Sequence, residues 1–293
     1  MKYLFLDVDG TLINYNTQLP KSAKQAVEKA QKNGHKVIIC TGCSRCEIES
    51  RAMDLKFDGV IYGNGCYVEY NQEVIFHRPL SLEQCTHFVN WCNQRDLAFR
   101  LECNDGMFLS EGYEEKSKEA RYKYIYGHGE YDPNKPLPPL SRHMISGQNL
   151  LRDDVNKTAF ILKSYQDFLD AKEEFKDMTV DTWGGKGELA LYGATRAKGF
   201  DKENSIHLLL DKLNVDPKDA IAFDDGVVDI PMFKACGFSV AMANGNDEVK
   251  NAVDYVTDDV DQDGLYKAFE YLKLILFFSI LFQMFEQLLR VNL

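Results

Sequence analysis

The chain has 293 residues, 45% of them hydrophobic and 27% charged, which is an ordinary composition for one large or two average soluble domains. Its 45 acidic residues outnumber 34 Lys and Arg, and the net charge of −11 argues against nucleic acid or an anionic membrane as the main partner. Eight cysteines do not make a disulfide scaffold and no signal peptide is recognisable, so we expect reduced thiols and a cytoplasmic location.

The first predicted element is a buried strand over residues 3–6 that ends in Asp7-Val-Asp-Gly-Thr11. An unbroken apolar run fits a strand covered on both faces, and open parallel sheets bind ligands at the carboxyl ends of their strands. In an extended chain Asp7 and Asp9 share a face, so their charges would crowd unless a cation lies between them. That predicts a hard divalent ion, Mg²⁺. The alternative is an Asp-Gly turn without a ligand, and this stretch alone does not separate the two.

Strands then alternate with helices, which indicates βαβ units and a parallel sheet with helices on both faces. The first helix is expected to have Ser22 as its N-cap and Gly34 as its C-terminal stop. The expected elements are a helix over 22–33, a strand over 36–40, a helix over about 45–55 and a strand over 59–62.

Three cysteines near the second strand have the spacing C-x₂-C-x₂-C: Cys40, Cys43 and Cys46. This spacing is part of an iron–sulfur signature. A fourth ligand at a usual offset and the usual following proline are both missing, so the pattern disfavours a cluster.

The pattern changes after residue 63, and residues 81–187 are interpreted as a separate α+β domain inserted into the first. The helix at its start is expected to turn Leu82, Cys85, Phe88 or Val89, and Cys92 inward. The expected elements are a hairpin over 68–76 with its turn at Asn71-Gln72, a helix over 81–95, a hairpin of 97–103 and 107–110, strands over 158–163 and 178–183, and a helix over 166–175.

From residue 188 the alternation resumes, so residues 1–80 and 188–272 are predicted to form one core domain. The expected elements are strands over 189–192, 220–223 and 238–242, and helices over 202–213, 229–236 and 247–253 and from 263 onward. The last segment, 273–293, is apolar and helical in pattern. Its apolar run is too short for a confident membrane span, so a packed helix or a dimer contact is favoured, and the chain is expected to be a monomer or a homodimer.

Polar groups follow four of these strands and would meet at one edge of the sheet. They are Asp7 and Asp9, Thr41 and Gly42, Lys202, and Asp225 and Asp229. Each could be a turn residue or a solvated helix start. Together they suit phosphoryl transfer, in which one carboxylate attacks phosphorus and a second handles protons. Mg²⁺ between Asp7 and Asp225 would neutralise charge, and Thr41 and Lys202 would bind the remaining phosphate oxygens.

These motifs resemble those of the haloacid dehalogenase (HAD) superfamily phosphatases, and the insert resembles the type IIB cap of the Cof-like branch. The resemblance covers the chain to about Leu272 and implies an α/β fold, a Rossmann-like doubly wound parallel sheet with an inserted α+β cap. It makes Asp7 the nucleophile and Asp9 the general acid/base. The implied metal ligands are Asp7, the carbonyl of Asp9 and Asp225. Asp229 and Asn244 would support the metal site.

Three cations compete for the third motif: Arg196, Lys198 and Lys202. Lys202 is preferred because Gly199-Phe-Asp-Lys202 and the apolar positions after it fit the family's spacing, and Lys198 is the fallback. The chain departs from the family's usual residues at three positions. Asp224 stands where Gly is usual, Val228 where Asn is usual, and Cys43 where Arg is usual.

The resulting hypothesis is a Mg²⁺-dependent phosphatase of small phosphorylated metabolites, with sugar phosphates implied by the resemblance. Two rivals remain. A degenerate member could bind a phosphorylated ligand without efficient turnover, and a phosphoryl-accepting regulatory domain would use a similar Asp cluster. The residues that could line the substrate pocket of the cap are His143, Arg100, Arg121 and Trp183, and each could equally be a surface or packing residue.

Overall fold

We describe the protein from a computed structural model, which describes residues 1–50, 54–185 and 187–275. Most of the predicted tail, residues 276–293, lies outside this range. Tertiary contacts divide the chain into two compact units. Unit 1 comprises Met1–Ile39, Leu55–Asp58 and the chain from Asn214 onward, and unit 2 comprises Cys40–Asp54 and Gly59–Leu213. The two units are described separately.

The sheet of unit 1 is parallel, with strand order β14-β13-β12-β1-β2. Its first two strands in sequence are β1 (Tyr3–Leu6) and β2 (Lys36–Cys40), and the others are β12 (Ala220–Asp224), β13 (Phe238–Ala241) and β14 (Tyr255–Val256). Every residue of β1 and β12 is buried, as the continuous apolar runs predict for central parallel strands. The short strand β14 was not expected from the sequence.

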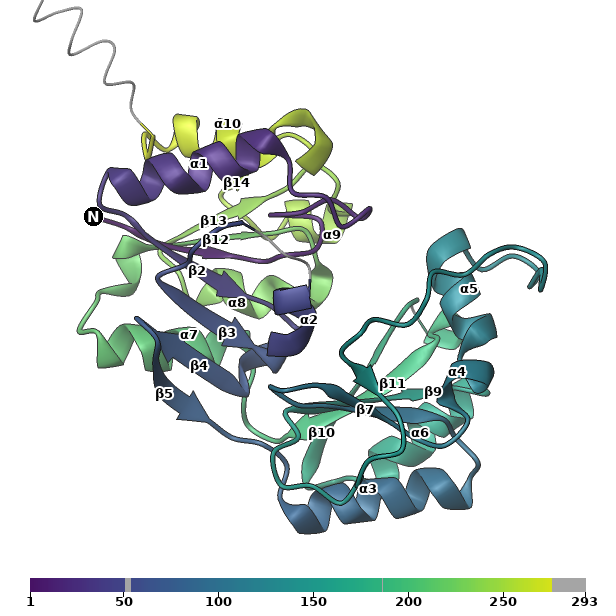
Figure 1. Ribbon diagram of the computed structural model, residues 1–293. Coiled ribbons are helices and arrows are strands. Elements are labelled where there is room, and N and C mark those ends of the chain that lie inside the picture. Colours follow the sequence, from purple (N-terminus) through teal and green to yellow (C-terminus); the bar gives the residue numbers. More distant parts are fainter. Residues whose placement is uncertain (51–53, 186, 276–293) are drawn as a thin grey trace, which may run out of the picture. The chain divides into compact units, whose positions relative to one another are not determined.

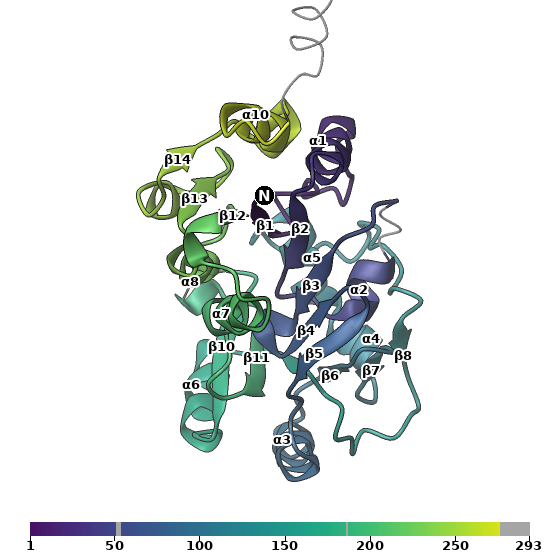
Figure 2. The same cartoon turned by 90° about the vertical axis from the view of Figure 1, so that its left-hand side faces the viewer.

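Helices cover both faces of this sheet. Figures 1 and 2 show α1 (Lys21–Lys32) beside α10 (Gly264–Tyr271) on one face and α8 (Ile230–Lys234) on the other. The predicted N-cap Ser22 is wrong, because α1 starts one residue earlier and Pro20 occupies the cap position. Gly34 does end the helix, with a φ of +85°. The doubly wound α/β architecture is thereby confirmed for this part of the chain.

Unit 2 begins with the loop after β2, then α2 (Arg45–Ser50), β3 (Gly59–Tyr62) and a hairpin of β4 (Tyr67–Tyr70) and β5 (Glu73–His77). The turn of the hairpin falls at the predicted dipeptide, where Asn71 and Gln72 both have positive φ, at 50° and 67°. The helix α7 (Lys202–Lys212) packs on β3, and its Ser205 hydroxyl donates to the carbonyl of Gly65 at 2.9 Å.

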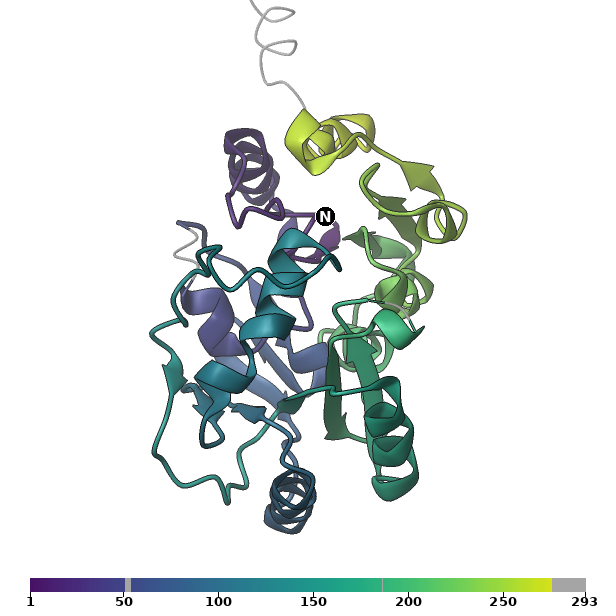
Figure 3. The same ribbon diagram turned by 90° about the vertical axis from the view of Figure 1, so that its right-hand side faces the viewer.

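A six-stranded mixed sheet forms the rest of unit 2, in the order β10-β11-β9-β6-β7-β8. Its strands are β6 (Phe99–Glu102), β7 (Met107–Leu109), β8 (Met144–Ile145), β9 (Lys157–Ile161), β10 (Met178–Trp183) and β11 (Tyr192–Ala197). Figure 3 shows α3 (Leu82–Gln94) and α6 (Tyr165–Glu174) against it, with α4 (Tyr113–Lys116) and α5 (Lys118–Tyr126) nearby. The largest core cluster of the unit joins α3, α6 and the strands, with Phe88, Phe99 and Phe160 at its centre.

Two expectations in this region need correction. Leu82 was expected to face inward but is 51% exposed, since it is the first residue of α3 and precedes the buried stripe that begins at Cys85. The strand expected over 189–192 is instead β11, which begins at Tyr192 and pairs antiparallel with β9 and β10. The sheet of the insert therefore extends to Ala197. The division into a core of 1–80 and 188–272 and a cap of 81–187 stays a prediction.

Candidate active site

The ends of β1 and β12 bring three carboxylates together in unit 1. The two strands pair in parallel with Leu6 opposite Phe223, and the amide of Asp7 donates to the carbonyl of Phe223 at 3.0 Å. Asp7 therefore lies beside Asp224 where the strands end. Carboxylate oxygens of Asp7, Asp224 and Asp229 all lie within 4.8 Å of one another, and all three residues are buried.

The carboxylate of Asp224 is held by the chain that follows it. Its Oδ1 accepts hydrogen bonds from the amides of Asp225 at 2.7 Å and Gly226 at 2.8 Å. Val228, two residues further on, is 77% exposed. The extra Asp at position 224 therefore joins the acidic cluster, whereas the Val at position 228 points to the surface.

Asp225 makes a different set of contacts. Its Oδ1 accepts from the hydroxyl of Thr11 at 3.1 Å, and its Oδ2 accepts from Asn244 Nδ2 at 3.1 Å and from the hydroxyl of Tyr15. Asn244 also donates to the carbonyl of Gly10 at 2.8 Å. Asp225 thus ties the loop after β1 to the loop after β13, and the predicted supporting residue Asn244 is one of its donors.

Gly10 is required by the closeness of Asp225. Its φ is +87°, and a Cβ at this position would lie 2.2 Å from Asp225 Oδ2. The loop that starts at Asp7 closes on itself here, because the amide of Gly10 donates to the carbonyl of Ile13 at 2.7 Å. The Asp-Gly turn weighed from the sequence is thus present, and it lies against the acidic cluster instead of replacing it.

Tyr15 was not identified from the sequence. Burial of its hydroxyl, together with the hydrogen bond to Asp225 and the charge of that carboxylate, raises the pKa of Tyr15 above its ordinary value. The phenol therefore remains a donor at neutral pH. Nothing in the polar stretch after Ile13 marks this residue, because its role depends on a partner 210 positions further along the chain.

The second and third motifs lie in unit 2. Thr41 is 2% exposed, and its Oγ1 accepts from the amide of Cys43 at 3.1 Å. Lys202 is 3% exposed at the first turn of α7, a helix that Asp201 caps by accepting from the amide of Asn204. The two rivals of Lys202 are engaged elsewhere. Lys198 donates to the carbonyl of Lys176, and Arg196 pairs with Asp181.

Four charged residues of unit 2 form a buried network next to the second motif. Arg100 and Lys157 both contact Glu102, which has no exposed surface, and Arg100 also lies 3.8 Å from Glu47. Burial lowers the pKa of Arg100 and of Lys157, but the charges of Glu102, Glu47 and other neighbours together outweigh it, so both pKa values lie above their ordinary values. Both cations are charged at neutral pH.

The other residues proposed for a substrate pocket have partners within unit 2. The ring of Trp183 stacks on Tyr192 with centroids 3.8 Å apart, and Arg121 donates to the carbonyl of Pro138. The carbonyl of His143 accepts from the amide of Met107 at 2.8 Å. Whether any of them touches a substrate stays a prediction.

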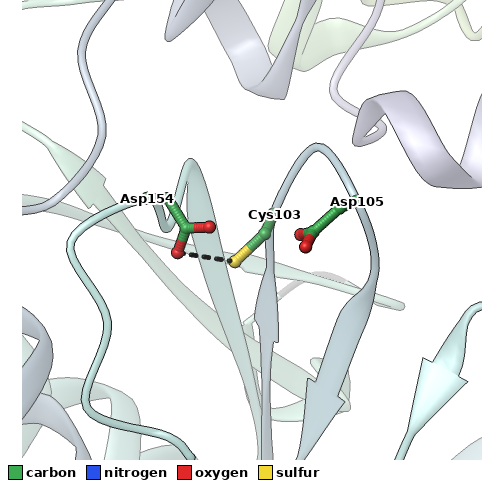
Figure 4. A group of neighbouring side chains, drawn as sticks. All are labelled: Cys103, Asp105 and Asp154. Atoms are coloured by element: carbon green, nitrogen blue, oxygen red, sulfur yellow. Dashed lines mark hydrogen bonds between the residues drawn. The ribbon is translucent and has the colours of Figure 1, made fainter.

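A second cluster with metal-binding composition lies in unit 2, at the end of β6 (Figure 4). Ligand atoms of Cys103, Asp105 and Asp154 lie within 4.8 Å of one another. The thiol of Cys103 donates to Asp154 at 3.6 Å, and Arg152 pairs with the same carboxylate. Across residues 1–50, 54–185 and 187–275, Cys40, Cys43 and Cys46 do not form such a group, and none of the eight cysteines is in a disulfide bond.

The family is established by comparison with known proteins. Residues 4–269 match the model of the haloacid dehalogenase-like hydrolases, and the chain belongs to this family. The chain is 23% identical to 5-amino-6-(5-phospho-D-ribitylamino)uracil phosphatase YwtE of Bacillus subtilis (strain 168), with 90% of this chain and 96% of that protein covered. The expectation of a HAD-like hydrolase, raised by the motifs, is thereby confirmed.

Solved structures agree on the fold. The phosphatase BT1666 from Bacteroides thetaiotaomicron superposes with a TM-score of 0.75 and 26% identity, covering 94% of this chain and 96% of that one. The HAD subclass IIB sugar phosphatase BT4131 superposes with a TM-score of 0.71 and 23% identity, covering 94% of this chain and all of that one. Within the described part of the chain, no helix is both long and apolar enough to cross a bilayer.

Proposed function

We propose that this protein is a Mg²⁺-dependent phosphatase that acts on small phosphorylated metabolites through an aspartyl-phosphate on Asp7. The observation that carries the proposal is the acidic cluster of Asp7, Asp224 and Asp229 where β1 and β12 end. Open parallel sheets bind ligands at this edge. The family match and relatives whose names identify them as phosphatases support the reaction class.

The donor set of the cluster fits Mg²⁺. It consists of carboxylate oxygens from buried residues, and Mg²⁺ prefers oxygen ligands and is often held by one or two carboxylates. The motifs propose Asp7, the carbonyl of Asp9 and Asp225 as ligands, and the geometry adds Asp224 and Asp229 as nearby carboxylates. When bound, the ion would neutralise negative charge on the transferring phosphoryl group.

The chain's own residues account for the two chemical steps. In the first, an oxygen of Asp7 bonds to phosphorus while the ester bond breaks, and Asp9 gives its proton to the departing oxygen. In the second, water attacks the phosphoryl group and passes a proton to Asp9, and the bond between Asp7 and phosphorus breaks to release phosphate. The hydroxyl of Thr41, the amide of Gly42 and the ammonium of Lys202 are proposed to bind phosphate oxygens.

Lys202 is favoured as the phosphate-binding cation by its surroundings. It is buried at the start of α7, whereas Lys198 is exposed and donates to a backbone carbonyl, and Arg196 is paired with Asp181. A cytosolic setting is also proposed, which is consistent with eight cysteines that form no disulfide bond among the described residues.

The substrate class is proposed to be sugar phosphates. This choice is supported by the likeness in fold to BT4131, which is described as a sugar phosphatase. A phosphate-release screen over phosphorylated sugars, nucleotides and other metabolites, with and without Mg²⁺, tests it directly. Turnover of a sugar phosphate that requires Mg²⁺ is expected. Tight binding of a phosphorylated ligand without phosphate release across the panel would instead favour the non-catalytic alternative.

A further inference from the structure

A buried carboxylate and two cations connect the six-stranded sheet of unit 2 with the loop that carries the second motif. Glu102, on β6, has a side chain with no exposed surface. It accepts from Arg100 Nε and Nη2, both at 2.9 Å, and its Oε2 lies 3.2 Å from Lys157 Nζ. Lys157, the first residue of β9, has a side chain that is only 13% exposed.

The ammonium of Lys157 reaches beyond Glu102 to the loop. It donates to the carbonyl of Gly42 at 2.7 Å, across 115 positions of sequence. Gly42 directly follows Thr41, so this hydrogen bond holds the peptide unit between the two residues that follow the motif threonine. A substituent on Gly42 would collide with Asn64 Oδ1, which a Cβ would approach to 2.8 Å. The backbone here is therefore confined from both sides.

Arg100 makes a second connection to the same loop. Its Nη2 lies 3.8 Å from Glu47 Oε1, and Glu47 Oε2 accepts from both the amide and the hydroxyl of Ser44. The four side chains carry two positive and two negative charges, so the network is balanced. Loss of Lys157 alone would remove one of the two positive charges that contact the buried carboxylate of Glu102.

In this loop the hydroxyl of Thr41 can donate a hydrogen bond to a ligand. The Oγ1 atom of Thr41 accepts from the amide of Cys43, so its proton is available to another acceptor. A phosphate oxygen would be such an acceptor. A loop whose donors are fixed before the ligand arrives binds more tightly, because less ordering is needed on binding.

We propose that Lys157 is a positioning residue for phosphate binding: through the carbonyl of Gly42 it fixes the loop that presents Thr41. The inference rests on the proposed function, which assigns this loop to the phosphate. Lys157 acts from the six-stranded sheet of unit 2 and need not touch the substrate. It is distinct from Lys202, which is proposed to contact the phosphate itself.

The competing interpretation is that Lys157 only balances the buried charge of Glu102. A double variant that combines Lys157→Met with Glu102→Gln distinguishes the two interpretations. This double variant removes one positive and one negative charge, so Arg100 and Glu47 still balance each other and no unpaired carboxylate is buried. The link to Gly42 is lost in the double variant as in the single one.

The experiment measures binding of inorganic phosphate by calorimetry in the presence of Mg²⁺, together with kcat and KM for a generic phosphomonoester and the melting temperature. We compare Lys157→Met, the double variant and Lys157→Arg, with Lys163→Met as the matched control. Lys163 lies just past the other end of β9, is 54% exposed and donates to the carbonyl of Arg95.

The double variant is expected to melt close to the wild type but to bind phosphate about tenfold more weakly, as loss of a charged hydrogen bond implies, with KM raised more than kcat is lowered. Lys157→Arg should restore binding to within about threefold, because a charged donor remains. Lys163→Met should match the wild type. Phosphate affinity and KM within about twofold of the wild type in the double variant would overturn the inference.

Failure of the proposed function gives a different result. If the wild type binds phosphate but releases none from any substrate, the phosphatase assignment fails while the effect on phosphate affinity still tests Lys157. If the wild type turns over and the double variant binds phosphate equally well, the positioning role fails and the phosphatase assignment stands.

Discussion

Two clusters of the molecule could each hold a metal ion by their composition, one with three carboxylates and the other with a thiol and two carboxylates. Asp7, Asp224 and Asp229 converge in unit 1, and Cys103, Asp105 and Asp154 converge in unit 2 (Figure 4), in each case within 4.8 Å. In the second cluster, Arg152 Nε donates to Asp154 at 2.7 Å, and its Nη2 lies 3.5 Å from Asp105. The positive charge of the guanidinium therefore already lies against both carboxylates.

The protonation state of the Cys103 thiol is a further difference between the two clusters. Burial, and then the charge of Asp154, raise the pKa of Cys103 above its ordinary value, so the sulfur keeps its proton and donates it to Asp154. A metal ligand must be a thiolate. In the first cluster, Asp224 Oδ1 accepts from the backbone amides of Asp225 and Gly226. The lesson is that metal-binding composition alone does not mark a metal site, because Arg152 and the hydrogen bond from the thiol already engage the carboxylate of Asp154 in the second cluster.

The largest expected effect separates the clusters by activity. Asp7→Asn should lower Mg²⁺-dependent phosphate release by at least about a thousandfold, because the attacking carboxylate is lost. Asp154→Asn should leave the rate within about twofold. Both are measured with a generic phosphomonoester at saturating Mg²⁺. Equal losses in the two variants would remove the distinction.

The next effect concerns the affinity of the first cluster for Mg²⁺. Mg²⁺ at about 100 times its Kd should stabilise the wild type by about 2.7 kcal/mol. Asp224→Asn and Asp229→Asn should reduce this gain, because each removes a carboxylate of the cluster. The gain is measured as the rise in melting temperature on titrating Mg²⁺. Asp154→Asn is the matched control. If Asp154→Asn lost the stabilisation by Mg²⁺ while Asp224→Asn and Asp229→Asn kept it, the ion would bind the second cluster and not the first.

Arg152→Met tests whether the guanidinium is what holds the second cluster together. The variant loses the ion pair with Asp154 and the stacking of the guanidinium over Phe108, 3.8 Å from the ring centroid. The side chain of Asp154 is 43% exposed, so solvent screens the pair, and we expect a loss of about 1–2 kcal/mol. Urea unfolding measures it. An unchanged urea midpoint would show that these contacts of Arg152 do not stabilise the fold.

The smallest expected effect is the pH dependence of the stability that the ion pair between Arg152 and Asp154 contributes. Burial raises the pKa of Asp154, but the hydrogen bonds and charge of Arg152 outweigh this, and the net pKa lies below its ordinary value. A carboxyl with a depressed folded pKa contributes stability above its unfolded pKa of about 3.9 and loses it as pH falls through the folded value. The difference in unfolding free energy between wild type and Asp154→Asn should therefore be constant from neutral pH to about 4 and shrink below that. A difference that grows on acidification would contradict the assignment.

The sequence predicted the elements whose signals are local. The strand over 36–40 and the strand over 59–62 match β2 and β3, and Ser81 caps α3 through a capping box with Gln84. The turn at Asn71 was recognised from residue type alone, because positive φ favours Asn and Gly. These features depend on neighbours within a few residues.

The features that were missed depend on distant partners. Tyr15 contacts a carboxylate 210 positions away, and Lys157 contacts a carbonyl 115 positions away, so no local pattern distinguishes them from other polar residues. The early strand at 189–192 was misplaced because register with β9 and β10, and not the apolar pattern, sets where β11 begins. The motif residues Asp7, Thr41 and Lys202 were recognisable only because motifs combine residue type with spacing.

The most direct test of the central claim is to trap the intermediate. The protein is mixed with Mg²⁺ and a phosphomonoester that it hydrolyses. The reaction is quenched in acid within the first turnover, and the protein is digested for mass spectrometry. We predict a phosphoryl group on the peptide that contains Asp7, absent from Asp7→Asn. Rapid turnover with no phosphoryl group on that peptide, or with the group on another residue, would contradict the account.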